Sequence, residues 1–588
     1  MSGLASILWT AAAILAAILA ARFWSPPGLF GRLSAALNGV WAPIVAGVVT
    51  SLIVAFVWGS FRQVPLLHDG IAYLTQARIF STFHLYGGPR PLPEFFEQYH
   101  MFVTPKFMAK YPPGQSLSLV PGVWIGLPSL MPILLAGVTG ALVFALARHI
   151  SNAWVALLTW MLWSTAPGVL NFLPSYLSQT TTSALWLVGW WGLLRWRDDN
   201  RRRYLLLLAA CIALGILTHP FTWLLYALPA GVAVLTIVVR RRTWKDLALA
   251  SMIGCIGLGL LFGWSAETMG TGLRMPWSVY ADTYFPWDRL GFSDDSTSPK
   301  RELPSDMVSF AASQRVFRAG HTVDTLPSQL ASRLIAIFGD EWGDWRRILA
   351  PFALISLIAI GSELRLALVS VGVVILGFLL YGYDPQWTAY YVELYPVLAF
   401  ATALGLWRFM CPVHQPKMTL REIGTCTFSH HADIAMLVLA GALLPVCASS
   451  IWMNRRAPTL SENPIVTFTK AAAALPGKRI IIFVRYAPTH PVNWSLVTND
   501  ADLEDARAWR VHDRGANDIC LMRLAPARVP YLFDEATNTF ALLDSSSVAA
   551  QRVAAATAVS RTSHANGTPV SQQHCCAPVA CLSQASSS

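Results

Sequence analysis

Two polar segments of the chain carry ionisable side chains directly beside apolar sequence. The first contains His68, Asp69 and Tyr73, and it follows an apolar run that ends near residue 60. The second contains Lys110 and Tyr111, after which two prolines and a glycine lead back into apolar sequence. Because both segments border apolar runs, we expect them at the boundary between water and lipid. We predict that they form the walls of one site, held in place by the other membrane spans.

Asp69 has two interpretations. A carboxylate just outside the bilayer, in an aromatic setting, is expected to have its pKa raised by desolvation and to act as a general base. Tyr73, Ala77 and Phe80 follow at helical spacing and predict a short helix along the bilayer with one apolar face. Since aspartate is favoured at helix starts, Asp69 is also a candidate helix cap. The two roles do not exclude each other.

Lys110 is a candidate ligand for a phosphate group. The Pro-Pro pair after it predicts a helix start, where free backbone N–H groups also favour anions. The alternative is a lysine that merely extends to the membrane surface. Arg78 and Arg274 carry the same two interpretations, as further phosphate ligands or as surface anchors.

Other side chains are expected to line the cavity between these segments. They are His68, Tyr73, Tyr111 and His219. His219 stands in a short turn between two predicted spans, where a structural role is the alternative. No His/Asp/Glu cluster has the spacing of metal ligands, so the sequence assigns no metal site. No glycine-rich phosphate loop is present either, so any energy source has to arrive with the substrate.

The composition is that of a protein with many membrane spans. Of 588 residues, 54% are hydrophobic and 13% are charged, whereas a soluble protein would carry about a quarter charged residues. The net charge of +11 does not indicate nucleic-acid binding, because the basic residues fall in short clusters between apolar runs. The sequence therefore predicts a polytopic all-α membrane protein.

Twelve membrane spans are predicted from the apolar runs. They are 4–22, 42–60, 129–147, 153–170, 179–195, 204–218, 221–239, 246–265, 347–361, 366–383, 389–407 and 432–451. Sixteen Lys and Arg residues fall in one set of connecting loops, and the short loops of the other set contain none. The basic loops are therefore predicted to face the cytoplasm. With an even number of spans, both termini are expected on the opposite side.

The membrane part is expected to have two regions. Residues 1–41 form an extra N-terminal span and a cytoplasmic loop, and residues 42–451 form the main membrane domain. Its long outer loops are 61–128 and 266–346. An apolar stretch after Pro113 is too short to span a bilayer and is expected to be re-entrant or interfacial. The end of the second loop has amphipathic spacing and is predicted to lie on the surface.

The composition changes to that of a soluble domain after the last span. Residues 452–544 are expected to form a small extracytoplasmic α/β domain. Its predicted elements are a helix at 465–475, a strand at 479–485, a helix at 503–509 and a strand at 519–524. Residues 545–588, rich in Ser, Ala, Thr and Gln, are expected to be disordered.

Three motifs occur in order along the membrane domain. They are His68-Asp69-Gly70-x-x-Tyr73-Leu74, Lys110-Tyr111-Pro112-Pro113-Gly114 and Thr218-His219-Pro220-Phe221. In this order and with this sidedness, they resemble the motifs of GT-C glycosyltransferases. The closest likeness is to the family 39-like branch, which includes protein O-mannosyltransferases and lipid A aminoarabinose transferases. The resemblance covers residues 40–410.

The resemblance implies a catalytic membrane domain that uses a sugar linked to polyprenyl phosphate on the extracytoplasmic face. By motif match, Asp69 is the base that activates the acceptor, Lys110 contacts the donor phosphate, and Tyr390 lies near that phosphate. Without the resemblance, Tyr390 would be read as part of an aromatic belt at the membrane surface. The sequence departs from the family at Gly70, where a glutamate is usual, and at Ala109, where metal-binding members carry an acidic residue. A divalent metal cofactor therefore stays an open alternative and is not assigned.

The sequence thus predicts a multi-pass glycosyltransferase of the bacterial inner (plasma) membrane. Its expected partners are a polyprenyl-phosphate-linked sugar, the lipid bilayer and an acceptor that is a glycan, a lipid or a protein; nucleic acid is excluded. Two alternatives stay open. One is a transporter or flippase of lipid-linked sugars, although the predicted spans lack the charged mid-membrane residues typical of transporters. The other is a GT-C-like protein that Gly70 renders catalytically inactive.

Overall fold

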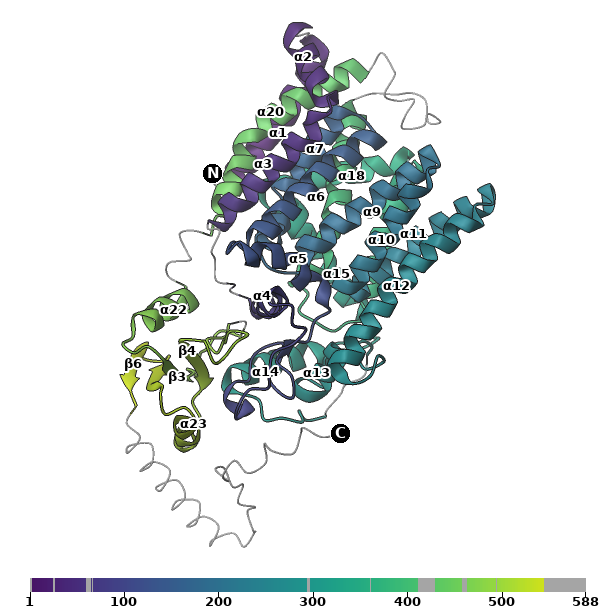
Figure 1. Cartoon of the computed structure of the whole chain (residues 1–588). Coiled ribbons are helices and arrows are strands. Elements are labelled where there is room, and N and C mark those ends of the chain that lie inside the picture. Colours follow the sequence, from purple (N-terminus) through teal and green to yellow (C-terminus); the bar gives the residue numbers. More distant parts are fainter. Residues whose placement is uncertain are drawn as a thin grey trace.

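The computed structural model describes residues 3–24, 27–59, 65, 67–292, 297–359, 361–410, 429–456, 463–492 and 494–543. Most of this chain is helical, and Figure 1 shows a long helix bundle with shorter helices and a small sheet at one end. We call this end of the bundle the loop end. The expected disordered tail, 545–588, lies outside the described residues.

Seven helices are long and apolar enough to cross a membrane by length and composition, among the residues that the structure describes. They are α1 (Gly3–Phe23), α3 (Trp41–Trp58), α6 (Leu130–Ile150), α11 (Pro220–Arg241), α12 (Trp244–Met269), the continuous run of η4 (Thr388–Leu394) with α18 (Tyr395–Met410), and α20 (Ser429–Met453). Each satisfies its backbone hydrogen bonds internally, which is the requirement for a segment inside lipid. All seven coincide with predicted spans.

The remaining five predicted spans correspond to shorter, broken or more polar helices. They are α7 (Ala153–Ser164), α9 (Gln179–Asp199), α10 (Arg202–Thr218), α17 (Ser362–Phe378), and the run of η2 (Asp344–Leu349), α16 (Ala350–Ile355) and η3 (Ser356–Ala359). The predicted count of twelve spans is therefore not confirmed. Figure 1 places the start of α1 and the exit from α20 toward the loop end of the bundle.

The bundle is built from pairs of helices that are mostly near neighbours in the chain. Helix α3 packs on α6, and α10 packs on α9 and α12. Other pairs join distant parts of the chain: α1 packs on α20, and α7 packs on α18. Helix α2 (Pro27–Asn38) lies between α1 and α3 in the chain and reaches the opposite end of the bundle from the sheet (Figure 1).

Short elements gather at the loop end. They are α4 (His68–Ser81), η1 (Pro93–Phe95), β1 (Met101–Phe102), β2 (Met108–Ala109), α5 (Pro113–Trp124), α8 (Pro167–Phe172), α13 (Pro276–Tyr284), α14 (Ser305–Ala319), α15 (Leu326–Trp342) and η4 (Thr388–Leu394). The predicted helices after Asp69 and after Pro113 are confirmed as α4 and α5, and the amphipathic end of the second loop forms α15. These elements carry the residues of the candidate site.

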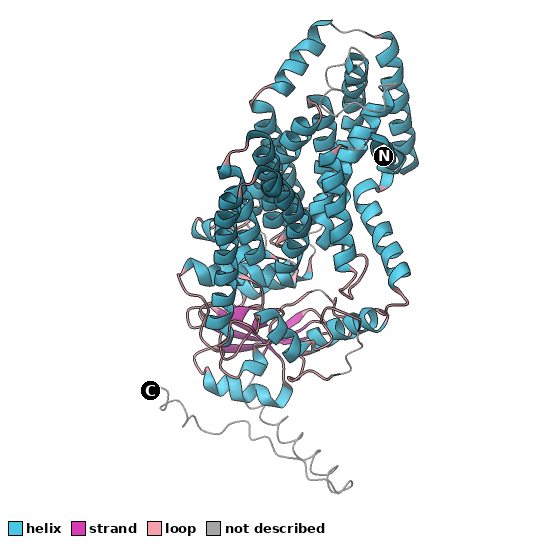
Figure 2. Ribbon diagram, turned by 90° about the vertical axis from the view of Figure 1, so that its right-hand side faces the viewer, coloured by secondary structure: helices cyan, strands magenta, loops and turns pink. Residues whose placement is uncertain are grey.

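The C-terminal region forms a four-stranded sheet with the strand order β4-β3-β5-β6. Strand β3 pairs in parallel with β4 and β5, and β6 is antiparallel to β5. Figure 2 shows these strands at one end of the helices. The elements are α22 (Pro464–Ala474), β3 (Ile480–Arg485), β4 (Ala508–His512), η5 (Gly515–Asn517), α23 (Asp518–Leu524), β5 (Val529–Asp534) and β6 (Thr539–Leu542).

Two predicted elements of this region have the wrong type. The expected helix at 503–509 is wrong, because its last residues begin strand β4, which pairs with the buried residues of strand β3. The expected strand at 519–524 is wrong, because it forms helix α23. A short apolar run has the same periodicity in a buried strand and in a buried helix segment. The expected helix at 465–475 and strand at 479–485 are confirmed.

The C-terminal sheet packs against the loop that precedes β1. Phe95 and Phe96 share a buried cluster with Phe483 and Trp509. A ring nitrogen of His512 lies 2.8 Å from the backbone carbonyl of Glu97. The sheet therefore holds residues 95–97 in place, and the loop that follows them leads to His100.

Candidate active site

Helix α4 places Asp69 in its first turn, with the side chain directed at a neighbouring tyrosine. The N-cap position belongs to Leu67, and no side chain caps this helix. The helix-cap interpretation of Asp69 is therefore wrong. Its carboxylate instead accepts a hydrogen bond from the hydroxyl of Tyr111. Tyr73, one turn along α4, stacks on Tyr111 with 4.5 Å between ring centroids.

The β1–β2 hairpin sets the position of Lys110. Met101 pairs with Ala109, and the backbone N–H of Lys110 then donates to the carbonyl of His100 over 2.8 Å. Gln76 of α4 accepts a hydrogen bond from the N–H of Ala109, 2.9 Å away. A residue from α4 thus fixes the strand that leads into Lys110, and the pairing brings His100 beside it.

His68, Asp69 and His100 form a compact cluster, which we call the His–Asp–His trio. His68 Nδ1 lies 3.2 Å from Asp69 Oδ2, and His100 Nε2 lies 3.5 Å from Asp69 Oδ1. The two rings meet through His68 Nδ1 and His100 Nε2, 2.7 Å apart. The ring of Tyr99 stacks on His68, 4.7 Å between centroids, and Phe310 packs edge-on at 5.2 Å. Aromatic rings therefore cover the His68 side of the trio.

His100 is held in a strained backbone conformation. Its φ angle is 58°, a left-handed value that is uncommon for residues other than glycine. The backbone N–H of His100 donates to the Tyr280 hydroxyl over 2.8 Å, and the Tyr99 hydroxyl donates to the carbonyl of Asp306 over 2.7 Å. Hydrogen bonds to α13 and α14 therefore hold the backbone in this conformation. Strained conformations held in this way are common at functional sites.

The pKa of Asp69 shifts in the direction opposite to the expectation. Burial by itself raises the pKa of this carboxyl, but the imidazoles of His100 and His68 and the hydrogen bonds from His68 and Tyr111 outweigh burial. The pKa of Asp69 is therefore lowered, and the expected rise is wrong, because these partners could not be foreseen from the sequence. Asp69 is an ionised carboxylate at neutral pH.

Lys110 is half-buried and lies beside aromatic rings. Its ammonium lies 5.1 Å from the ring centroid of Tyr280 and 5.3 Å from that of Tyr111. Burial lowers the pKa of Lys110, while the charges of Asp288 and Asp69 act in the opposite direction. A cation in this setting is suited to an anionic ligand, because it has lost most of its water and has no single close carboxylate partner at ion-pair distance among the described residues.

Asp69 and Lys110 line the same cavity, which has a volume of about 790 Å³ and which we call the loop-end cavity. The predicted cavity residues His68, Tyr73, Tyr111 and His219 line it as well, and so does Tyr390, which was predicted to lie near the donor phosphate. The rings of His219 and Tyr390 lie 6.1 Å apart on the wall that belongs to the helix bundle. Tyr390 therefore belongs to the cavity wall.

Arg78 and Arg274 do not line this cavity. Arg78 pairs with Asp500 of the C-terminal region, with 2.7 Å between Nη1 and Oδ1. Arg274 lies 4.0 Å from Asp282, and more than half of its side chain is exposed. The cation that lines the cavity beside Lys110 is Arg289, which the sequence analysis did not single out.

Gly70 and Gly114, the glycines of the first two motifs, differ in whether a side chain would fit at their positions. A Cβ atom at Gly114 would lie 2.4 Å from the Thr218 hydroxyl oxygen, so only glycine lets the start of α5 meet the turn that carries His219. A Cβ atom at Gly70 would lie 3.5 Å from its nearest neighbours, an ordinary contact. The backbone therefore explains the glycine of the second motif and does not require the glycine at position 70.

Several cavity residues could not be identified from the sequence. They are His100, the adjacent pair Asp288 and Arg289, and Tyr381, which come from three separate segments and are brought together only by the packing of the fold. His100 also completes a group of three side chains that could hold a metal ion, whereas the sequence assigned no metal site. The one signal in the sequence was His100 itself, a titratable residue inside an aromatic run of the predicted outer loop 61–128.

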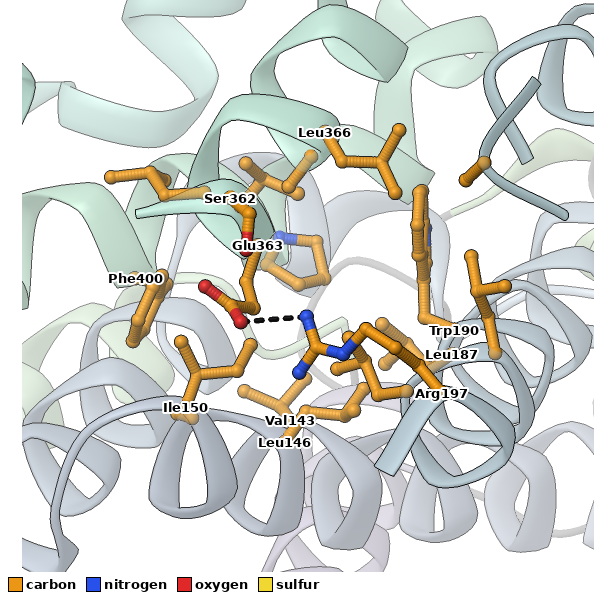
Figure 3. A pocket seen from close by; sticks show the side chains of 18 of the residues that line it. Val143, Leu146, Ile150, Leu187, Trp190, Arg197, Ser362, Glu363, Leu366 and Phe400 are labelled. Atoms are coloured by element: carbon orange, nitrogen blue, oxygen red, sulfur yellow. Dashed lines mark hydrogen bonds and ion pairs between the residues drawn. The ribbon is translucent and has the colours of Figure 1, made fainter. Parts of the chain in front are cut away.

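A second cavity of about 400 Å³ lies at the other end of the same helices. Figure 3 shows its apolar walls, formed by residues such as Val143, Leu187 and Phe400, and one ion pair between Arg197 and Glu363. The guanidinium and carboxylate of this pair are 2.6 Å apart. Since Arg197 and Arg240 both line it, we call it the arginine-end cavity.

Comparison with known proteins gives one family match. Residues 128–264, which run from the start of α6 into α12, match the family of dolichyl-phosphate-mannose-protein mannosyltransferases. This match bears out the resemblance to GT-C membrane glycosyltransferases of the family 39-like branch. No curated protein matches the chain.

Two solved structures of ArnT from Cupriavidus metallidurans are similar to this chain. The structure bound to undecaprenyl phosphate has 13% sequence identity and a TM-score of 0.46, and the match covers 76% of this chain and 84% of that chain. The apo structure has 13% identity and a TM-score of 0.48, with 83% and 92% covered. Likenesses this distant carry no weight for the activity or for the roles of residues.

Proposed function

We propose that this protein is a glycosyltransferase that moves a sugar from a polyprenyl-phosphate donor to an acceptor in the loop-end cavity. The observation that carries the proposal is the meeting of Asp69 and Lys110 in one cavity, although they belong to different segments. The first offers an ionised carboxylate, and the second offers a desolvated cation. Transfer from a phosphate needs one group for the acceptor proton and one for the leaving charge.

The proposed reaction is a single displacement. The acceptor hydroxyl oxygen attacks C1 of the donor sugar, and the bond between C1 and the phosphate oxygen breaks. The bonding electron pair leaves with the phosphate beside Lys110, and the hydroxyl proton passes to Asp69. Attack from the side opposite the leaving phosphate inverts the configuration at C1.

The lowered pKa of Asp69 sets the timing of the proton transfer. A carboxylate of low pKa is a weak base toward a free hydroxyl. The hydroxyl becomes much more acidic as its oxygen bonds to a sugar carbon that carries positive charge, as in the transition states of glycosidic chemistry. We therefore assign Asp69 the role of accepting the proton late in the displacement.

The family match supports the identity of the donor. The matching family is named for a mannose carried on dolichyl phosphate, which is a polyprenyl phosphate. The matched residues 128–264 include the turn with His219, which lines the cavity. The donor tail would lie along the apolar surface of the bundle while its phosphate reaches Lys110.

The arrangement of charge supports an extracytoplasmic site. Arg197, Arg202 and Arg241 cluster where α9, α10 and α11 begin or end, away from the loop-end cavity. Positive residues of this kind mark the cytoplasmic side of membrane proteins. We therefore propose that the loop-end cavity and the C-terminal sheet face outward across a bacterial inner membrane.

The test is sugar transfer by the purified full-length protein in detergent. The probes are polyprenyl-phosphate-linked mannose, glucose and aminoarabinose, each radiolabelled in the sugar, with a cell-envelope extract as the source of acceptor. We expect one donor to be consumed, with label appearing in the extract and free polyprenyl phosphate released. A donor that crosses liposomes with its glycosidic bond intact would indicate a transporter, and no cleavage of any donor would indicate an inactive protein.

A further inference from the structure

The His–Asp–His trio has the composition and the geometry of a metal site. Its ligand atoms are one nitrogen from His68, one from His100 and a carboxylate oxygen of Asp69, all within 4.8 Å of one another. Ligands held at 2.0–2.2 Å from one ion, at tetrahedral or octahedral angles, lie about 2.9–3.5 Å apart. The two ring nitrogens lie 2.7 Å apart. Each lies near a different oxygen of the Asp69 carboxylate, at 3.2 Å from Oδ2 for His68 and 3.5 Å from Oδ1 for His100, so small side-chain shifts would place both nitrogens and one carboxylate oxygen on one ion.

The trio also has one open side. The side chains of His68 and His100 are 7% and 4% exposed, whereas that of Asp69 is 24% exposed. All three line the loop-end cavity. Three protein ligands on one side and a cavity on the other is the arrangement of catalytic metal sites, which keep a coordination position for water or substrate.

The charges of the cavity favour a cation at this place. Its lining residues include three carboxylates, Asp69, Asp288 and Asp384, against the cations of Lys110 and Arg289. A divalent ion beside Asp69 would turn the net formal charge of the lining positive. The cavity would then be suited to an anionic ligand such as a phosphate.

We propose that His68, Asp69 and His100 bind one divalent transition-metal ion at the wall of the loop-end cavity. Two imidazole nitrogens and one carboxylate favour Zn²⁺, Co²⁺ or Mn²⁺ over Mg²⁺ and Ca²⁺, which prefer oxygen ligands alone. The open position faces the cavity and accepts an oxygen of a bound hydroxyl or phosphate. These ligands do not include position 109, so Ala109 has no bearing on the site. Binding of the ion does not depend on the proposed transfer reaction.

The experiment measures metal binding by the full-length protein in detergent, after removal of metal with a chelator. Equilibrium dialysis against Zn²⁺ gives the stoichiometry by elemental mass spectrometry, and titration with Co²⁺ gives the affinity from visible absorption. We expect one ion per chain, with a Co²⁺ spectrum typical of nitrogen and oxygen ligands. His100→Gln and His68→Asn should each weaken binding at least about tenfold, the smallest loss usual for disturbed metal sites.

The matched control is His219→Gln, which changes a histidine of the same cavity that lies outside the trio. It should keep one ion per chain, and thermal unfolding checks that each variant is folded. Wild-type protein that binds no ion, or trio variants that bind as the wild type does, would overturn the proposal and leave a hydrogen-bonded trio only. A protein that binds one ion through the trio but cleaves no sugar donor would overturn the proposed function and support the metal site.

Discussion

The two cavities of this protein are built from opposite ends of the same helices and differ in every property that matters for chemistry. Helix α9 contributes Gln179 to the loop-end cavity and Arg197 to the arginine-end cavity. Helix α17 contributes Phe378 to the first and Glu363 to the second. The loop-end cavity holds carboxylates, cations and histidines, whereas the arginine-end cavity is apolar around one ion pair.

The difference follows from which segments close each cavity. The arginine-end cavity is closed by helices alone, so its walls are the apolar faces that pack the bundle. The loop-end cavity is closed by α4, the β1–β2 hairpin, α13 and α14, and these segments bring titratable groups from outside the apolar runs. The long helices of the bundle form a rigid scaffold, and the shorter segments at the loop end carry the residues that can react or bind a ligand. Changes in the two cavities should therefore affect different measurable properties.

The largest effect is expected from Asp69→Asn. The asparagine keeps the shape of the side chain but cannot accept the acceptor proton, so transfer should fall by about 10²–10⁴-fold, the usual worth of a positioned base. The rate of sugar transfer by purified protein measures this. Asp500→Asn, which removes an exposed carboxylate that pairs with Arg78, should leave the rate within a few-fold of the wild type. Equal rates for Asp69→Asn and the wild type would show that Asp69 is not the base, and the loop-end cavity would then lose its assigned role in catalysis.

Lys110→Ala should weaken donor binding by about 10–100-fold, because a charge-assisted hydrogen bond to phosphate is lost. The quantity to measure is the dissociation constant for polyprenyl phosphate in detergent. Lys106→Ala is the matched control, since Lys106 lies in the loop of the hairpin that precedes Lys110 but bonds the backbone carbonyl of Glu267 instead of lining the cavity. If both variants bind the lipid equally well, Lys110 is only a surface anchor.

The third effect concerns the wall of the loop-end cavity near Val492. His490 lies 2.7 Å from Glu535 through Nδ1 and 3.0 Å from the carbonyl of Trp494 through Nε2, so both ring nitrogens face acceptors. Burial by itself lowers the pKa of His490, but these hydrogen bonds and the charge of Glu535 outweigh burial and raise the pKa above 6.5. Protonated His490 therefore stabilises the fold below pH 6.5, and this stabilisation is lost as pH rises through the raised pKa.

His490→Gln should accordingly destabilise the protein by about 2 kcal/mol at pH 6, the scale of hydrogen bonds to charged groups. The difference from the wild type should shrink as the pH is raised above the pKa of His490. Thermal unfolding of both proteins across this pH range measures it. A difference that is constant with pH would show that His490 is not protonated in the fold.

The smallest effect is expected at the arginine-end cavity. Glu363→Gln removes the partner of Arg197 and should cost about 1 kcal/mol of stability, as for partly exposed ion pairs. The transfer rate per folded molecule should not change. Asp246→Asn, which removes a looser pair with Arg202 at 4.0 Å, should cost less. Loss of transfer in Glu363→Gln without loss of folded protein would assign a catalytic role to this cavity.

The sequence predicted the long helices of the bundle better than it predicted which residues meet in the candidate site. Long apolar runs predict helices such as α6 and α12 directly, because length and apolarity alone set this outcome. Broken segments such as α16 were predicted as a span, since hydropathy does not report where a helix is interrupted. Short runs such as 519–524 were assigned to the wrong element because their periodicity is ambiguous.

Within the site, the sequence could identify Asp69 and Lys110, because each follows or precedes an apolar run with a recognisable local pattern. It could not identify His100, which reaches Asp69 only through the hairpin and the strained backbone at this position. The direction of the pKa shift of Asp69 was missed for the same reason. Residues that act through tertiary contacts leave no local pattern to read.

The most direct test of the central claim is an experimental structure of the protein with bound polyprenyl phosphate. We predict that the phosphate lies in the loop-end cavity within about 4 Å of the Lys110 ammonium, the limit of a direct ion pair. Asp69 should then face the open side of the phosphate, where the sugar would be attached. A phosphate bound at Arg197 and Arg240 in the arginine-end cavity, with the loop-end cavity unoccupied, would contradict the account.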